Sequence, residues 1–184
     1  MPDPASSPVR ASSAALAPPR VFRVVIKAPV ADVWREITRT DAPIKCFFNS
    51  RMHLSRGGLA PGSRMAMRSP DGRITGVVGE ILEIVLLKKF SHTFRFTNMD
   101  DPPCVVTYEL REVPEGTEFT LTITDAVQGS KTLKQMTQGG TLIANTLKSV
   151  LETGRPSLGV RLFLFMIGLF PVPKKCRSEH WPVD

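Results

Sequence analysis

The longest hydrophobic pattern in the sequence lies between Ser130 and Gly154. Its apolar residues recur at steps of three, four and seven, which places them on one face of a helix. They are Leu133, Met136, Ile143, Leu147, Val150 and Leu151. Gly154 ends the pattern, because glycine readily adopts the left-handed cap and the following Pro156 cannot continue a helix. A helix of this length, roughly 35 Å, needs a large apolar surface to lie on.

Two adjacent glycines, Gly139 and Gly140, interrupt this helical pattern. Each costs about 1 kcal/mol relative to alanine in a helix interior. The pair therefore indicates the true start of the helix, a kink, or a place where the sheet or a ligand comes close.

Ahead of this helix, apolar and polar residues alternate in a way that is typical of half-buried strands. The predicted strands are 20–27, 51–54, 65–68, the apolar run 74–87, 90–96, 106–111 and 119–123. Two helices, 30–39 and 41–47, are predicted after the first strand. Short connections such as the Asp71-Gly72 turn imply antiparallel pairing. The order predicts an α+β fold, in which a curved antiparallel sheet wraps around the long C-terminal helix.

Composition divides the chain into three parts. Residues 1–19 are rich in proline, alanine and serine and are predicted to form a disordered N-terminal tail. Residues 20–154 form one globular domain, and residues 155–184 form an apolar and basic C-terminal extension. The whole chain is 42% hydrophobic and 22% charged, as expected of a globular protein.

The net charge of +7 favours weak attraction to anionic surfaces. The charges are scattered and no nucleic-acid-binding motif accompanies them, so we expect no nucleic acid partner. The three cysteines, Cys46, Cys104 and Cys176, are widely spaced, which argues against a disulfide framework or a zinc site. We also expect no secretory signal and no membrane span, and the predicted location is the cytoplasm.

The C-terminal extension contains an unbroken apolar run from Leu162 to Phe170, with Arg161 before it. Lys174, Lys175 and Arg177 follow. The run is too short to cross a bilayer, which needs roughly 20 residues. Three interpretations remain: a peripheral membrane contact with basic residues facing anionic lipid, packing on the parent domain over the cavity, or a homodimer contact. The sequence favours packing, on the same chain or on a second copy.

Several phrases of the sequence together resemble a known superfamily. They are KAPVADVWREIT, LAPGSRM, SPDGR, GEILEIV, FSHTFRF, VTYELREVPEGTEFTLT and QGGTLIANTLKSVLETG. Their order resembles the SRPBCC superfamily, with the helix-grip fold of START and birch-pollen-allergen proteins. Within it, the chain looks like the family of heat-shock-chaperone ATPase activator homologues. The resemblance implies the fold but no single function, since this fold supports binding, transfer and catalysis.

The sequence departs from that family at two places that would border a cavity. Phe47-Phe48 stands where relatives tend to carry a tyrosine or tryptophan followed by glycine. Thr141 stands where relatives often have tryptophan. The identity of a ligand therefore does not carry over from the family.

The candidate site is a cavity between the sheet and the long helix. By strand alternation His92 shares a face with Phe94 and Phe96, and Tyr108 shares a face with Val106. The predicted lining is His92, Tyr108, Phe94, Phe96, Val106, Phe119, Leu121, Met67, Met136 and Ile143. The two polar residues would orient an apolar ligand. The more common outcome for such residues is an ordinary core histidine and tyrosine with backbone partners.

Motifs for catalysis, metals and nucleotides are missing from the sequence. It contains no GxSxG motif and no phosphate-binding glycine loop, and its three histidines lack the spacing of metal ligands. We therefore expect no cofactor and no metal. The leading hypothesis is non-catalytic binding of a small hydrophobic molecule, lipid or polyketide-like. The alternatives are a cyclase or hydrolase-type enzyme using the same cavity, and a chaperone-interacting protein similar to an ATPase activator.

Overall fold

The computed structural model describes residues 15–167 and 171–184. In chain order the elements are β1 (Arg20–Ile26), α1 (Val30–Thr38), η1 (Lys45–Phe47), β2 (Arg51–Leu54), β3 (Arg64–Arg68), β4 (Thr75–Val85), β5 (Lys89–Phe96), β6 (Cys104–Val113), β7 (Gly116–Thr124), α2 (Lys131–Thr153), α3 (Leu158–Ile167), η2 (Lys174–Cys176) and η3 (Ser178–His180).

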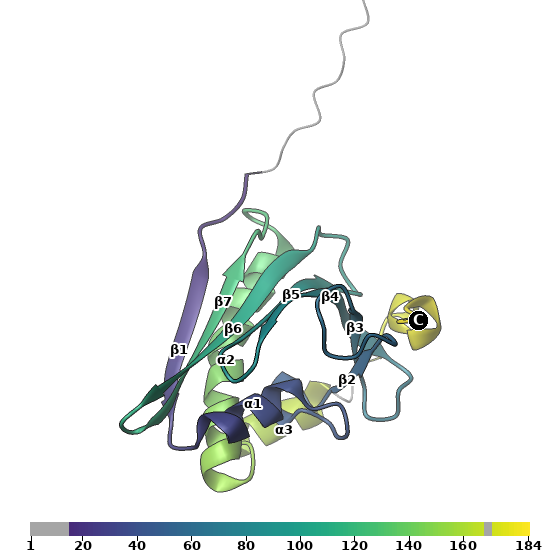
Figure 1. The fold of residues 1–184 in the computed structure, drawn as a ribbon. Helices are drawn as coiled ribbons and strands as arrows, with labels where there is room; N and C mark the ends of the chain where they lie inside the picture. Colours follow the sequence, from purple (N-terminus) through teal and green to yellow (C-terminus); the bar gives the residue numbers. More distant parts are fainter. Residues whose placement is uncertain (1–14, 168–170) are drawn as a thin grey trace, which may run out of the picture.

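The strands form one antiparallel sheet in the order β1-β7-β6-β5-β4-β3-β2. Register shifts interrupt the pairing between Met67 and Arg68 and between Ile81 and Glu83. Such bulges bend strands, and here they lie in the half of the sheet that curls over the interior (Figure 1). The long helix α2 lies against the curved sheet. This arrangement confirms the predicted α+β helix-grip fold.

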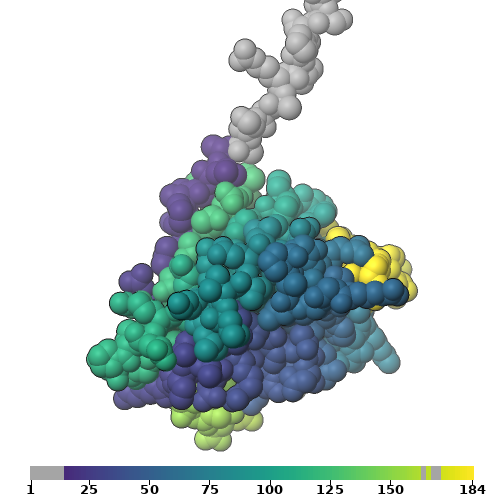
Figure 2. Space-filling model, viewed as in Figure 1, coloured from purple at the N-terminus to yellow at the C-terminus, as the bar shows by residue number. Residues whose placement is uncertain are grey.

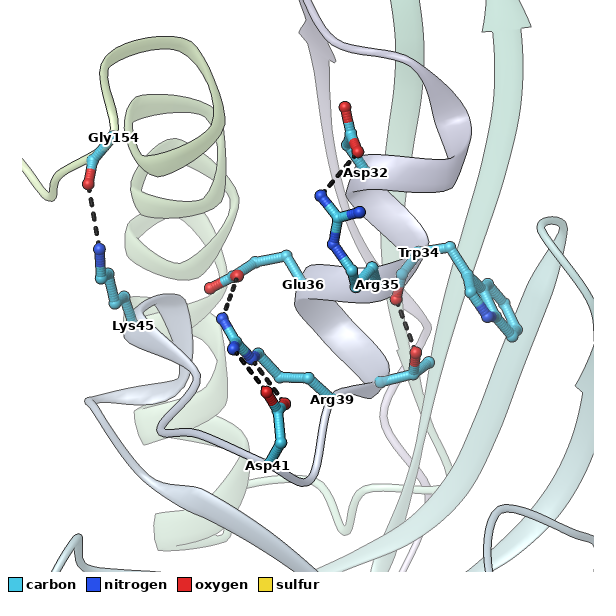
Figure 3. A network of polar contacts seen from close by, with 9 residues as sticks. Asp32, Trp34, Arg35, Glu36, Arg39, Asp41, Lys45 and Gly154 are labelled. Carbon is cyan, nitrogen blue, oxygen red and sulfur yellow. Dashed lines mark hydrogen bonds and ion pairs between the residues drawn. The ribbon is translucent and has the colours of Figure 1, made fainter.

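The helix α2 begins and ends at the positions that its capping residues predict. The Ser130 hydroxyl caps the first turn by accepting a hydrogen bond from the Leu133 backbone N–H, at 3.1 Å. At the other end Gly154 is left-handed, with a φ of 76°. The Lys45 ammonium donates to the Gly154 carbonyl at 3.0 Å (Figure 3), which ties η1 to the end of the long helix. A cation there also opposes the negative end of the helix dipole.

The glycine pair lies within α2, which continues through both residues. A methyl group added to Gly140 would overlap the ring of Phe22 on β1. A methyl group on Gly139 would meet no other atom within 4 Å. Close approach between helix and sheet, one of the three predicted alternatives, therefore explains Gly140.

The core lies between α1, α2 and the sheet. Leu147 is fully buried, and Trp34 and Leu121 belong to the same apolar cluster. The end of α1 is held by Arg39, whose guanidinium contacts the carboxylate of Glu36 at 3.5 Å and that of Asp41 at 3.0 Å (Figure 3). These contacts direct the chain from α1 into η1.

The second predicted helix is shorter than expected. The sequence predicts a helix over 41–47, whereas the structure has only the 3₁₀ turn η1. Pro43 disfavours helical geometry in the residue before it. Phe48 and Asn49 then take positive φ values of 54° and 57°, so the chain reverses directly into β2.

The N-terminal tail predicted over 1–19 lies in part outside the described residues, which begin at residue 15. From there the chain follows the segment after β7. The Ala17 backbone N–H donates to the Ala126 carbonyl at 2.8 Å, and Gln128 donates to Ala15 at 2.9 Å. Ala17 is buried by this contact.

The last part of the C-terminal extension packs on the parent domain. Arg177 forms a bridge with Ile74, and the Ser178 hydroxyl lies 2.9 Å from that of Thr75. Arg68 donates to the Trp181 carbonyl at 3.1 Å. Figure 2 shows these C-terminal residues, in yellow, seated at one edge of the molecule. One of the predicted interpretations, packing on the parent domain, therefore applies to this segment.

The helix α3 differs from that segment. Leu158, Leu162, Phe165 and Met166 expose 78%, 61%, 67% and 52% of their surface. The predicted apolar run continues over residues 168–170, which lie outside the described residues. Among the residues that the structure describes, no helix is long and apolar enough to cross a membrane.

Candidate functional site

A cavity of about 660 Å³ lies between α2 and the sheet. Nine of the ten predicted lining residues are on its wall: His92, Tyr108, Phe94, Phe96, Val106, Leu121, Met67, Met136 and Ile143. They come from β3, β5, β6, β7 and α2. Strand alternation and helical spacing thus identify about a third of the residues that line this cavity.

Phe119 is the exception among the predicted residues. It faces the interior, as strand alternation predicts, and is fully buried. However, it pairs with Leu110, one step beyond the pair of Leu121 and Tyr108, towards the end of β6 and β7 that α1 covers. Its ring stacks on Tyr108 at 5.9 Å between centroids. Phe119 therefore supports the cavity wall from behind.

Rings form the inner end of the cavity. The centroid of the His92 imidazole lies 5.1 Å from that of Phe90 and 5.8 Å from that of Tyr108. Phe47 packs on Tyr108 at 5.5 Å from the other side. Aromatic contacts at these distances hold both polar side chains in fixed orientations.

His92 is 3% exposed, and its Nδ1 lies 2.7 Å from the Thr93 carbonyl oxygen. A carbonyl only accepts, so Nδ1 carries the hydrogen and Nε2 is left with a free lone pair. Burial lowers the pKa of His92 to about 4, against a smaller opposing effect of the Thr93 hydrogen bond. The ring is therefore neutral at pH 7 and presents a hydrogen-bond acceptor.

Tyr108 is 5% exposed and reaches the cavity from β6. Burial raises the pKa of its hydroxyl well above the ordinary value, and the nearby Cys46 and Cys104 thiols add to the shift. The group is thus a neutral phenol that can donate a hydrogen bond. Within residues 15–167 and 171–184, its hydroxyl has no hydrogen-bond partner.

The shifted pKa of His92 predicts a pH dependence of stability. Between pH 6.5 and pH 4 the unfolded chain binds a proton at this residue and the folded chain does not. The contribution of the neutral His92 to the free energy of unfolding is therefore complete above pH 6.5 and is lost as the pH falls through this window. In the wild type, His92 should make the free energy of unfolding fall by on the order of 1 kcal/mol for each pH unit across this window. We expect His92→Gln to lack this fall. Urea denaturation measures the free energy of unfolding of both proteins.

The exposed His180 supplies the matched control for this pH experiment. His180→Gln removes an imidazole at the surface and so controls for the loss of a histidine as such. Comparing each variant with the wild type cancels the contributions of the other titrating groups to the pH profile. One of these groups is His53, whose pKa is also lowered by burial. Identical profiles for His92→Gln and the wild type would contradict a neutral, buried His92.

The opening of the cavity involves residues that the sequence analysis missed. Gln135, Gln138, Gly139 and Leu142 of α2 all border the cavity. Their spacing of i, i+3, i+4 and i+7 forms a second helical stripe beside the apolar one, so a signal was present. Phe48 of the turn after η1 is 43% exposed there. The opening thus lies along one side of α2.

The C-terminal extension also reaches the cavity. Val172, Pro173 and Cys176 lie on its wall, about 20 residues after the end of α2. No periodicity links these positions to the strands that they cover. Only the docking of the extension on Arg73 and Thr75 brings them there.

The buried Cys46 and Cys104 thiols and the described metal-binding side chains give little support for nucleophilic or metal chemistry. Burial raises the pKa of the Cys104 thiol to about 11, and that of Cys46 rises well above its ordinary value for the same reason. Both residues therefore carry protonated, weakly nucleophilic thiols. Among the described residues, no group of three histidine, cysteine, aspartate or glutamate side chains is placed to hold a metal ion.

Comparison with protein families gives one match. The family model described as "Activator of Hsp90 ATPase homolog 1-like protein" matches residues 27–152, more than half of the chain. The matched region begins at the end of β1 and includes all but the last residue of α2. None of the curated proteins matches the sequence at a significant level.

Solved structures with low sequence identity share the fold. CalU16 from Micromonospora echinospora is 18% identical with a TM-score of 0.60, over 82% of this chain and 83% of that one. The Aha1 dimer from Colwellia psychrerythraea is 17% identical with a TM-score of 0.59, over 75% and 98%. DynU16, a protein of the dynemicin biosynthetic locus, is 20% identical with a TM-score of 0.58, over 75% of this chain and 48% of that one.

Proposed function

Since this chain belongs to the family of Activator of Hsp90 ATPase homolog 1-like proteins, we propose that it uses the family's fold to bind a small hydrophobic molecule without catalysing a reaction. The observation that carries the proposal is the cavity beside α2, with its apolar wall and two polar groups at the inner end. The proposed compartment is the cytoplasm, where the three unpaired cysteines would stay reduced.

The size of the cavity supports a ligand. Protein interiors are close-packed and rarely contain voids larger than a water molecule. A volume of about 660 Å³ lies within the range of small-molecule sites. It corresponds to roughly 20 water molecules at ~30 Å³ each. Transferring an apolar ligand from water into such a space is favourable, because the apolar surfaces of both the ligand and the cavity wall are removed from contact with water.

The polar groups indicate the chemistry of that ligand. The neutral His92 offers a hydrogen-bond acceptor at Nε2, and the Tyr108 phenol offers a donor. A ligand hydroxyl can satisfy both, since it donates to one and accepts from the other. We therefore propose an apolar body, lipid or polyketide-like, that carries at least one hydroxyl or carbonyl oxygen. The occurrence of DynU16 in a biosynthetic locus is consistent with a small organic molecule.

Native mass spectrometry of the purified full chain tests the proposal directly. We expect a retained mass or, for the empty protein, saturable binding of the fluorescent probe 1-anilinonaphthalene-8-sulfonate in the cavity. Turnover of a bound ester or polyketide would favour the enzymatic alternative. Stimulation of a chaperone ATPase without any bound small molecule would favour the activator-like alternative. In either case binding would not be the principal function.

Tyr108→Phe should weaken ligand binding about two- to tenfold while leaving the fold intact. The substitution removes one hydrogen bond, which contributes about 0.5–1.5 kcal/mol, and keeps the ring contacts with Phe90 and Phe119. Isothermal titration with a retained ligand measures the change. The matched control is Thr122→Val, which removes a hydroxyl from the opposite face of the same sheet. Equal affinities in Tyr108→Phe and the wild type would remove Tyr108 from the site.

A further inference from the structure

The helix α3 presents an apolar stripe to solvent. Leu158, Leu162, Phe165 and Met166 occupy positions i, i+4, i+7 and i+8, which fall on one helical face. Each exposes more than half of its surface. Exposed apolar side chains that gather on one face of a helix mark an interaction surface.

The segment of sequence that contains this stripe is positively charged. From Gly154 to Ser178 the sequence contains no acidic residue. Arg155 precedes the stripe, Arg161 lies within it, and Lys174 and Lys175 follow it. All four are exposed, and Lys175 pairs with Asp100 at 3.3 Å. Arg161 belongs to α3 itself and can extend its long side chain from an apolar surface towards a polar layer.

The stripe is also close, along the sequence, to residues that line the cavity. The helix α3 begins shortly after α2 ends and leads from there towards β2 (Figure 1). Val172, which lies shortly after α3, is on the cavity wall and is 51% exposed. The apolar face of α3 and the opening of the cavity are therefore joined by a short stretch of chain.

We propose that α3 docks the protein on an anionic membrane surface. Its apolar stripe lies at the boundary between headgroups and acyl chains, and the flanking basic residues contact anionic headgroups. The cavity mouth then opens near the bilayer, which gives a hydrophobic ligand a path that avoids water. This docking goes beyond the proposed ligand binding and does not depend on it.

A homodimer fits the same observations less well. A stable interface involves roughly 20–30 residues a side, whereas the stripe has four exposed apolar residues among the side chains that the structure describes. Two copies meeting through α3 would also bring the basic residues of both chains together without an acidic residue from 154–178 to offset them. An anionic bilayer complements both the apolar face and the charge.

Flotation of the full chain with lipid vesicles tests the proposal. We expect binding to vesicles of phosphatidylcholine with phosphatidylglycerol, weaker binding to pure phosphatidylcholine, and a loss of binding at high salt. The double variant Leu162→Ser/Phe165→Ser should bind the anionic vesicles at least about tenfold more weakly. Both residues are exposed, so the variant should keep the circular dichroism and melting curve of the wild type.

Leu86→Ser is the matched control, because Leu86 is 70% exposed and belongs to the turn between β4 and β5, not to α3. It should bind vesicles like the wild type. Absence of flotation, or equal loss in the control and the double variant, would overturn the docking. A dimer in light scattering that the double variant abolishes, with vesicle binding unchanged, would assign the stripe to a second copy and overturn it as well.

One further variant separates the docking from the proposed ligand binding. A side chain added at Gly139 enters open space beside the cavity, so Gly139→Leu should obstruct ligand entry. This variant should still float with anionic vesicles. Loss of probe binding with retained flotation supports both proposals. Retained probe binding in Gly139→Leu would contradict ligand binding in the cavity and leave the docking proposal unaffected. Loss of flotation in this variant would overturn docking through α3.

Discussion

Replacing Leu147 with alanine should lower the free energy of unfolding by about 2–5 kcal/mol. Leu147 lies in the last third of α2, is 0% exposed, and belongs to the apolar cluster that contains Trp34 and Leu121. Truncation removes its transfer free energy and leaves a hole that α1, α2 and the sheet cannot all close at once. Urea denaturation followed by circular dichroism measures the loss.

Leu86→Ala is a suitable control for this measurement, since Leu86 is largely exposed. A truncation at such a position usually changes stability by less than about 0.5 kcal/mol. A loss below about 1 kcal/mol for Leu147→Ala would mean that α2 is not gripped by the sheet. Because both variants remove the same atoms, the difference between them mainly reports the burial of Leu147.

Alanine at Gly139 and alanine at Gly140 should change stability in opposite directions. At Gly139 the added methyl meets no neighbour, and alanine is the better helix former, so we expect a gain of about 0.5–1 kcal/mol. At Gly140 the methyl overlaps the Phe22 ring and forces β1 and α2 apart, so we expect a loss of about 1–3 kcal/mol. Urea denaturation of the two variants measures both.

The smaller side chain of Phe22→Leu tests the cause of the loss at Gly140. If the clash with the ring is the cause, the double variant Gly140→Ala/Phe22→Leu should lose less than the sum of the two single variants. Strict additivity, or a gain at Gly140 equal to that at Gly139, would show that helix propensity and not close approach governs the pair. The experiment thus tests close approach, one of the three interpretations that the glycine pair allows.

Local signals in the sequence were sufficient for most of the elements and for the polar residues of the cavity wall. Ser130 and Gly154 fix the ends of α2 because caps act through neighbouring backbone groups. Strand alternation placed His92 and Tyr108 on the inner face, since side chains alternate with a period of two whatever lies across the sheet. The phrases that resemble the activator family gave the helix-grip fold that the structure has.

Contacts between distant segments were decided by the tertiary structure alone. The proximity of Phe22 to Gly140 depends on how β1 meets α2, and the exclusion of Phe119 from the cavity depends on where α1 covers the sheet. The hydrogen bonds of Ser178 place Cys176 on the cavity wall. The sequence by itself determined which face each residue occupies, because that is set by local geometry. Which partner meets that face is set by packing across long sequence separations, and no periodicity encodes it.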